Sequence, residues 1–210
     1  MSPRRIVYLH GFASSPASSK AQLFRARFAA LGQELEIPDL AEGDFEGLTL
    51  SRQLAVIERT ADGEPVSLIG SSMGGYLAAL YAARHAEVEK IVLMAPAFDF
   101  ARRWRERLGE QETLRWRDSG FLDVFHYGEG KQQRVSYRLL EDGMAFEAYP
   151  PVSQPALIFH GRKDDVVDPA LSREFARRHP NAQLRLQDSD HQLLDVTEVI
   201  WVETARFLGY

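Results

Sequence analysis

Ser72 lies in the segment that most constrains this chain, Gly70-Ser71-Ser72-Met73-Gly74. An apolar run at residues 65–69 precedes the segment, and an apolar run with helical spacing at residues 76–83 follows it. Where a strand turns directly into a helix the two backbones meet, so the positions two before and two after the serine need glycine. The segment predicts a sharp, strained turn that holds the Ser72 hydroxyl clear of the backbone. The alternative is a Gly/Ser turn that only links two elements.

Short β-like runs alternate with amphipathic helical patterns along most of the chain. We expect strands at residues 6–9, 35–38, 66–69, 91–94, 156–159 and 182–186. We expect helices at residues 18–31, 48–60, from the glycine-flanked turn to His85, 169–178 and 196–208. Alternation of this kind predicts an α/β fold, in which a parallel sheet carries helices on both faces.

Residues 98–150 interrupt this alternation. They hold ten of the 22 aromatic residues, so the interruption has apolar surface of its own to bury. We expect a single domain, residues 1–210, in which residues 98–150 are inserted over one sheet edge as a lid above Ser72. The alternative is an insertion that packs only its own small core and has no role at Ser72. Within the insertion we expect short helices at 102–108 and 111–116, and a β-hairpin of residues 134–140 and 144–146 around the turn at 141–143.

Composition excludes several classes of function. The chain has 210 residues, no cysteine and a net charge of −5, so disulfides, thiolate metal sites and a cysteine nucleophile are excluded. The acidic balance argues against a nucleic-acid surface. Only four apolar residues, 6–9, follow the basic start, too few for a signal-peptide core, and no run has the 18 apolar residues of a membrane span. We expect a cytoplasmic protein without a membrane span.

A serine hydroxyl needs a neighbouring base to become a nucleophile, and a carboxylate must orient that base. At a strand-to-helix turn of this kind the partners follow in the order serine, acid, histidine. The expected strand at 156–159 leads into two adjacent carboxylates, Asp164 and Asp165, at the carboxyl edge of the sheet. His191 comes after the last expected strand and before the closing helix, and is the predicted base. Both carboxylates remain candidates for the acid, and solvated loop charges are the alternative.

The other five histidines have structural explanations by position. His10 begins the turn after the first strand, His85 ends a helix, and His126 lies in the insertion. His160 ends a strand, and His179 lies in a polar helix end.

Acyl transfer also needs donors for the oxyanion of the tetrahedral intermediate. The backbone N–H of Met73, directly after Ser72, is one candidate. The second is the N–H of Phe12, in the turn after the first strand, where Gly11 allows close approach; the alternative for Phe12 is a plain core side chain. Three aromatic residues of the insertion are expected to line an apolar acyl pocket: Trp104, Trp116 and Phe121.

Together, Leu9-His10-Gly11-Phe12, residues 70–74, residues 160–164 and His191 resemble the α/β-hydrolase superfamily. Residues 11–16 and 190–192 resemble the small bacterial YqiA-like esterases within it. The superfamily resemblance covers the chain outside residues 98–150. It favours Asp164 as the acid, three residues after Gly161, and leaves Asp165 as a helix or turn cap. The first strand here matches the superfamily's third, so we expect six parallel strands rather than eight.

The resemblance implies a serine hydrolase of small-molecule carboxylic esters or thioesters that needs no cofactor and no metal. The expected catalytic residues are Ser72, Asp164 and His191. A serine peptidase is a less favoured alternative because the chain is small. A binding module that keeps the fold without catalysis is the alternative from another class. The sequence leaves the oligomeric state, the acyl chain and the leaving group open.

Overall fold

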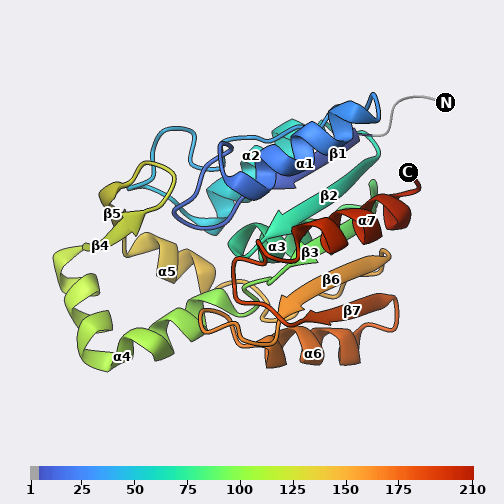
Figure 1. Cartoon of the computed structure of the whole chain (residues 1–210). Helices are drawn as coiled ribbons and strands as arrows, with labels where there is room; N and C mark the ends of the chain where they lie inside the picture. The colour runs from blue at the N-terminus through green and yellow to red at the C-terminus, as the bar shows by residue number, and fades with distance from the viewer. Residues whose placement is uncertain (1–4) are drawn as a thin grey trace.

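The fold is built on a parallel sheet of five strands. The computed structural model describes residues 5–210, so residues 1–4 lie outside the described part of the chain. The strands are β1 (Arg5–Leu9), β2 (Val66–Ser71), β3 (Val88–Met94), β6 (Ala156–Gly161) and β7 (Ala182–Gln187). They pair in that order, all in parallel (Figure 1). This is the α/β arrangement that the alternation of strand and helix patterns predicts.

Helices cover both faces of the sheet because its strands alternate apolar side chains toward each face. On one face, α1 (Ser19–Ala30) and α7 (Thr197–Leu208) pack against the strands through Phe24, Phe28 and Trp201. On the other face lie α2 (Leu50–Ala61), α3 (Met73–Ala82) and α6 (Pro169–Arg178). Both layers bury large side chains completely, which is the main source of stability in a domain of this size.

The sheet has one strand fewer than the six predicted. Residues 35–38 form only a single parallel bridge, in which the Glu36 N–H donates to Ile6 and the Glu36 carbonyl accepts from Tyr8. The next bond of a parallel ladder would need the N–H of residue 38. Because Pro38 has no N–H, the pairing stops after one residue.

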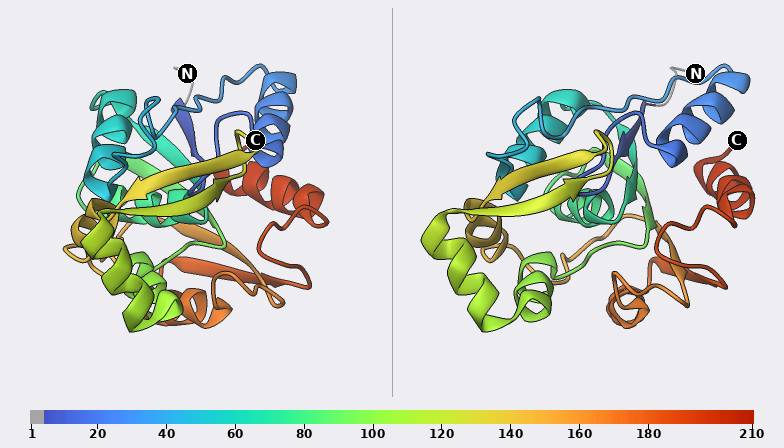
Figure 2. Two further views of the ribbon diagram at one scale, coloured as in Figure 1. Left: turned by 90° about the vertical axis from the view of Figure 1, so that its left-hand side faces the viewer. Right: turned by 60° about the vertical axis from the view of Figure 1, so that its left-hand side comes forward.

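The insertion lies beyond the carboxyl ends of the strands, as the two views in Figure 2 show. It contains α4 (Phe100–Ser119), β4 (Phe121–His126), β5 (Lys131–Ser136) and α5 (Arg138–Gly143). Gly109, at φ 77° and ψ 170°, interrupts α4 close to the predicted break between two short helices. The predicted hairpin was wrong: the antiparallel pair is β4 with β5, and residues 138–143 are helical.

Across residues 5–210, no helix combines the length and the apolar content that crossing a bilayer requires.

Candidate active site

Ser72 lies at the junction of β2 and α3, in the sharp turn that the sequence predicts. Its backbone has φ 54° and ψ −117°, a strained conformation for a residue with a side chain. A Cβ on Gly74 would lie 2.1 Å from the Leu9 carbonyl oxygen, and one on Gly70 would lie 2.3 Å from the Gly74 carbonyl oxygen. Both flanking positions therefore require glycine, because the neighbouring atoms are backbone.

A continuous chain of hydrogen bonds joins the side chains of Ser72, His191 and Asp164. The Oγ atom of Ser72 lies 3.1 Å from Nε2 of His191, and Nδ1 of His191 lies 2.7 Å from Oδ2 of Asp164. An ionised carboxylate only accepts, so Nδ1 carries the hydrogen, and Nε2 of the neutral imidazole accepts from the serine hydroxyl. The Asp164 side chain is fully buried, whereas 19% of the His191 side chain is exposed.

The Asp164 carboxylate is ionised and held at both oxygens. Oδ1 accepts from the N–H groups of Val166 (2.9 Å) and Val167 (2.8 Å). Burial opposes ionisation, but hydrogen bonds from His160, His191 and the Val167 N–H outweigh it, so the pKa of Asp164 is well below its usual range.

Asp165 is exposed and does not cap α6. The helix cap is Asp168, whose carboxylate accepts from the Ala170 N–H at 2.8 Å. Asp165 was expected to be a helix or turn cap, and the helix-cap part of that prediction is wrong because Asp168 takes this place. Pro169 occupies the first turn of α6, which fixes where the helix begins.

The loop that carries His191 is fixed against the end of β6. The Lys163 N–H donates to the Ser189 carbonyl at 3.0 Å, and the Asp190 carboxylate accepts from the N–H groups of Gln192 and Leu193. Leu193 is fully buried at φ 56°. Packing and hydrogen bonds therefore hold the imidazole of His191 between Ser72 and Asp164.

The turn after β1 lies beside Ser72 and contains the other predicted donor. A Cβ on Gly11 would lie 3.4 Å from the Ser72 Cβ, so the turn runs along the serine. Within residues 5–210, the N–H groups of Phe12 and Met73 have no hydrogen-bond acceptor. Two free N–H groups near one serine hydroxyl are the kind of donors that an oxyanion requires.

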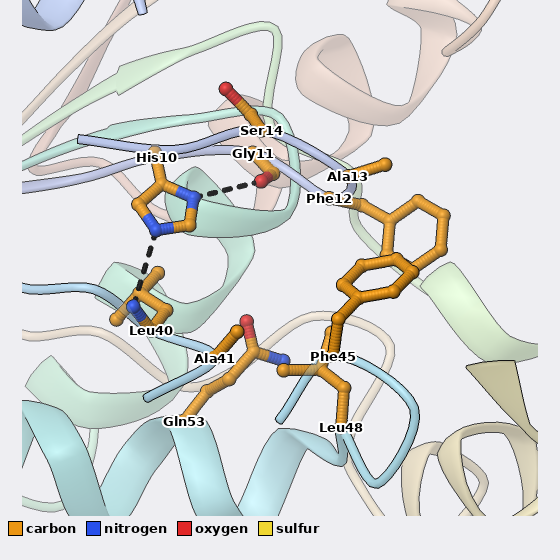
Figure 3. A pocket seen from close by; sticks show the side chains of 10 residues that line it. All are labelled: His10, Gly11, Phe12, Ala13, Ser14, Leu40, Ala41, Phe45, Leu48 and Gln53. Carbon is orange, nitrogen blue, oxygen red and sulfur yellow. Dashed lines mark hydrogen bonds between the residues drawn. The ribbon is translucent and has the colours of Figure 1, made fainter. Parts of the chain in front are cut away.

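His10 holds this turn in place (Figure 3). Its Nδ1 lies 3.0 Å from the Gly11 carbonyl oxygen, and its Nε2 accepts from the Leu40 N–H at 3.2 Å. A neutral ring with the hydrogen on Nδ1 satisfies both partners. Burial lowers the pKa of His10, which favours this neutral form. The space enclosed here is only about 10 Å³, so the turn is tightly packed.

The three aromatic residues predicted to line a pocket lie in different environments. The ring of Trp104 contacts that of Phe12, with 5.1 Å between centroids, so Trp104 lies against the turn. Trp116 is only 1% exposed, and its indole N–H donates to the Val135 carbonyl, so it belongs to the core rather than to a pocket wall. Phe121 is exposed on the hairpin surface, where the guanidinium of Arg134 lies over its ring, 4.6 Å from the centroid.

A cavity of about 350 Å³ lies under the hairpin of β4 and β5. Ser14 and Ser15, which follow the Phe12 turn, form one side of it, and Glu129 and Gln133 of the hairpin form another. The hairpin turn rests on the β1 turn, since the Gly128 N–H approaches the Ala13 carbonyl at 3.4 Å. The insertion therefore contacts the segment that holds Phe12.

Two groups near the site were not singled out from the sequence. Lys20, in the first turn of α1, is partly buried, and burial lowers its pKa to about 8 although Asp190 and Asp164 oppose the shift. His160 is completely buried, and its Nε2 lies 3.1 Å from Oδ2 of Asp164. The spacing of four residues between His160 and Asp164, across Gly161, was the available signal. Residues 5–210 contain no group of three or more His, Asp or Glu side chains that could hold a metal ion.

Comparison with known proteins places the chain among α/β hydrolases. The family described as "Uncharacterised protein family (UPF0227)" matches residues 5–207. The chain is similar to the AB hydrolase superfamily protein YisY of Bacillus subtilis, at 25% identity over 86% of this chain and 82% of that protein. It is also similar, at 25% identity, to the mitochondrial palmitoyl-protein thioesterase ABHD10 of Bos taurus, over 92% of this chain and 69% of that protein. Among solved structures, mouse alpha/beta hydrolase domain-containing protein 10 shares the fold with a TM-score of 0.83, at 20% identity, over 99% of this chain and 90% of that one.

Proposed function

We propose that this chain, which belongs to the uncharacterised protein family UPF0227, hydrolyses carboxylic esters or thioesters through an acyl-enzyme on Ser72. The observation that carries the proposal is the unbroken path of hydrogen bonds from the Ser72 hydroxyl through His191 to the buried carboxylate of Asp164. A serine with these two partners has what it needs to attack an acyl carbonyl at neutral pH.

In the first half of the reaction, Oγ of Ser72 attacks the carbonyl carbon and its proton passes to Nε2 of His191. The oxyanion that forms is stabilised by the free N–H groups of Phe12 and Met73, at about 3–4 kcal/mol for each donor. Asp164 keeps the hydrogen on Nδ1 and stabilises the imidazolium. The intermediate then collapses, and His191 gives its proton to the departing alcohol or thiol.

In the second half, a water molecule attacks the acyl group on Ser72. Nε2 of His191 takes a proton from that water, and the same two N–H groups hold the second oxyanion. Collapse releases the carboxylic acid, and the proton returns from His191 to Oγ of Ser72. The same five groups, namely Ser72, His191, Asp164 and the two N–H groups, therefore serve both steps, and water is the only reactant besides the ester or thioester.

Two observations bear on the substrate. The bovine relative is named as a thioesterase, which supports thioesters as well as oxygen esters. The aromatic contact between Phe12 and Trp104 gives the turn an apolar neighbour, which suits an acyl chain. We further propose that residues 98–150 act as a lid, since their hairpin and helix α4 lie over the strand ends.

A fluorophosphonate probe tests the proposal, because it labels only a serine that is already activated as a nucleophile. Intact-mass measurement should find one adduct on the wild type and on Ser71→Ala, the adjacent serine of the same turn, but none on Ser72→Ala. Hydrolysis of p-nitrophenyl esters should follow the same pattern. An unlabelled but folded wild type would favour the non-catalytic binding module. Labelling that survives Ser72→Ala would show that another serine is the nucleophile.

A further inference from the structure

A second imidazole lies behind the acid of the proposed triad. His160 is the fifth residue of β6, and none of its side chain is exposed to solvent. Its Nε2 lies 2.9 Å from the Val167 carbonyl oxygen and 3.1 Å from Oδ2 of Asp164, the same oxygen that accepts from His191. Its Nδ1 lies 2.7 Å from Oγ of Ser172, a fully buried residue of α6.

The neighbours of this ring determine where its hydrogen is. A carbonyl oxygen and a carboxylate only accept, so Nε2 of His160 must carry a hydrogen. On the other side, the Ser172 hydroxyl has Nδ1 as its one hydrogen-bond partner in the described residues. The hydroxyl is satisfied only if it donates to Nδ1, which leaves the ring neutral. His160 therefore acts on Asp164 as a hydrogen-bond donor and not as a second positive charge.

With His160 in place, the Asp164 carboxylate has donors at both oxygens. The Val166 and Val167 N–H groups donate to Oδ1 and His191 donates to Oδ2, while the single Nε2 hydrogen of His160 is shared between the Val167 carbonyl and Oδ2. Donors at both oxygens disfavour a proton on the carboxylate and restrict its rotation. Without the His160 donor, Oδ2 would be held only by His191, the group that it has to orient.

We propose that His160 is a positioning residue of the triad, which fixes Oδ2 of Asp164 toward His191. This inference rests on the proposed function. His160 touches neither Ser72 nor a substrate, so it acts only through Asp164. Charged groups near this pair include Lys20 at the start of α1, Asp190 beside His191, the exposed Asp165, and Arg107 of α4, whose guanidinium donates to the Val166 carbonyl. None of them is changed in the test below.

Two substitutions separate the two ends of the ring. The amide of glutamine stands as many bonds from Cβ as Nε2 does, so His160→Gln can donate to Asp164 but loses the acceptor for Ser172. The amide of asparagine stands where Nδ1 does, so His160→Asn can accept from Ser172 but loses the donor to Asp164. Each variant leaves one buried partner unsatisfied, so both should lose comparable thermal stability.

Activity should separate these two variants. We expect kcat for p-nitrophenyl acetate to fall about tenfold or more in His160→Asn, with KM within about twofold, and to stay within about threefold in His160→Gln. The acid limb of the pH profile should move to higher pH only in His160→Asn, because a carboxylate with one donor fewer is a stronger acceptor for protonated His191. The downfield proton resonance of the bond between His191 and Asp164 should shift in the same variant.

His179→Asn is the matched control. His179 is a buried histidine at the end of α6 that bonds the Phe175 carbonyl and stacks on the Phe175 ring, away from the triad. It should leave kcat, the pH profile and the resonance unchanged. If His160→Asn does not fold, Ser172→Ala frees the far side of the ring and should lower kcat about two- to fivefold, with the same shift of the resonance.

Equal losses in His160→Asn and His160→Gln would overturn the inference, because His160 would then serve only stability. Wild-type kcat and an unmoved resonance in His160→Asn would overturn it as well. Both results leave the proposed function standing if the wild type still reacts with a fluorophosphonate. A folded wild type that does not react would remove the proposed function and the positioning role together.

Discussion

Gly161 controls the position of His191 although the two residues are not neighbours in sequence. It ends β6, and a Cβ added there would lie 2.4 Å from the carbonyl oxygens of Ser189 and Asp190. Ordinary contact for a Cβ begins at 3.4 Å, so the loop would have to retreat by about 1 Å (3.4 minus 2.4). The atoms in the way are backbone, and His191 is the next residue along the chain.

Gly161→Ala should therefore lower kcat/KM about 100-fold, because a misplacement of about 1 Å at a reacting group costs that much. The Ser72–His191 distance of 3.1 Å would increase beyond hydrogen-bonding range. The cost of overpacking is about 1–3 kcal/mol of unfolding free energy. Rates are measured with p-nitrophenyl acetate below the melting temperature of the variant, so that only folded protein is compared.

Gly47→Ala is the control for this substitution. Its Cβ would meet Asp44 and Arg52 at 2.5 and 2.7 Å, but these are the ends of half-exposed side chains that can rotate away. We expect wild-type kcat/KM. A folded Gly161→Ala with wild-type kcat/KM and wild-type labelling by a fluorophosphonate would refute the reasoning, because the loop would then tolerate the displacement.

Three further outcomes are expected. Asp164→Asn should lose at least about 1,000-fold in kcat, whereas Asp165→Asn, at an exposed position, should stay within about twofold; the reverse ranking would reassign the acid. The pKa of Asp164 is lowered by folding, so its ionisation stabilises the fold above the unfolded pKa of about 3.9. When the unfolding free energies of the wild type and of Asp164→Asn are measured against pH, the advantage of the wild type should shrink as the pH falls below about 4. Folding lowers the pKa of Lys20 from 10.5 to about 8, so its charge costs on the order of 3 kcal/mol below pH 8, and the cost fades toward pH 10.5. Lys20→Met should raise the melting temperature at pH 7 but not at pH 10.5, and the exposed Lys131→Met should do neither.

Much of the sheet and its helices can be predicted from periodicity, because each element packs a stripe of apolar residues against one core. The helix predicted at 169–178 matches α6, since Pro169 suits the first position of a helix. Residues 35–38 look like a strand but form one bridge, because the missing N–H of Pro38 matters only when a partner strand is known. Periodicity therefore predicts which elements exist better than it predicts how far each one pairs.

The insertion was harder to predict because a strand-like alternation of side chains runs directly into a helix within a few residues. Val135, Tyr137 and Leu139 alternate as in a strand, but β5 ends at Ser136 and the adjacent buried pair of Leu139 and Leu140 belongs to α5. The true strand β5 is mostly polar, since only Val135 of its six residues is buried. A polar strand on a surface hairpin gives little signal of its own.

At the site, the sequence predicts which segments meet but not how they are held. Ala13, Ser72, Ala95 and Leu193 all have positive φ, and they lie in turns that follow strands or in the loop that carries His191. Neither alanine nor leucine favours such a conformation, which costs about 1–3 kcal/mol for each residue. Only the surrounding packing and hydrogen bonds offset that cost, as the bond from the Lys163 N–H to the Ser189 carbonyl does. The buried contact of His160 with Asp164 also depends on the folded structure, because tertiary packing fixes the position of the Asp164 carboxylate. The strain and the second imidazole are therefore properties of the assembled site. Local sequence patterns pick out Ser72, Asp164 and His191, which the structure brings together, but not the contacts that hold them.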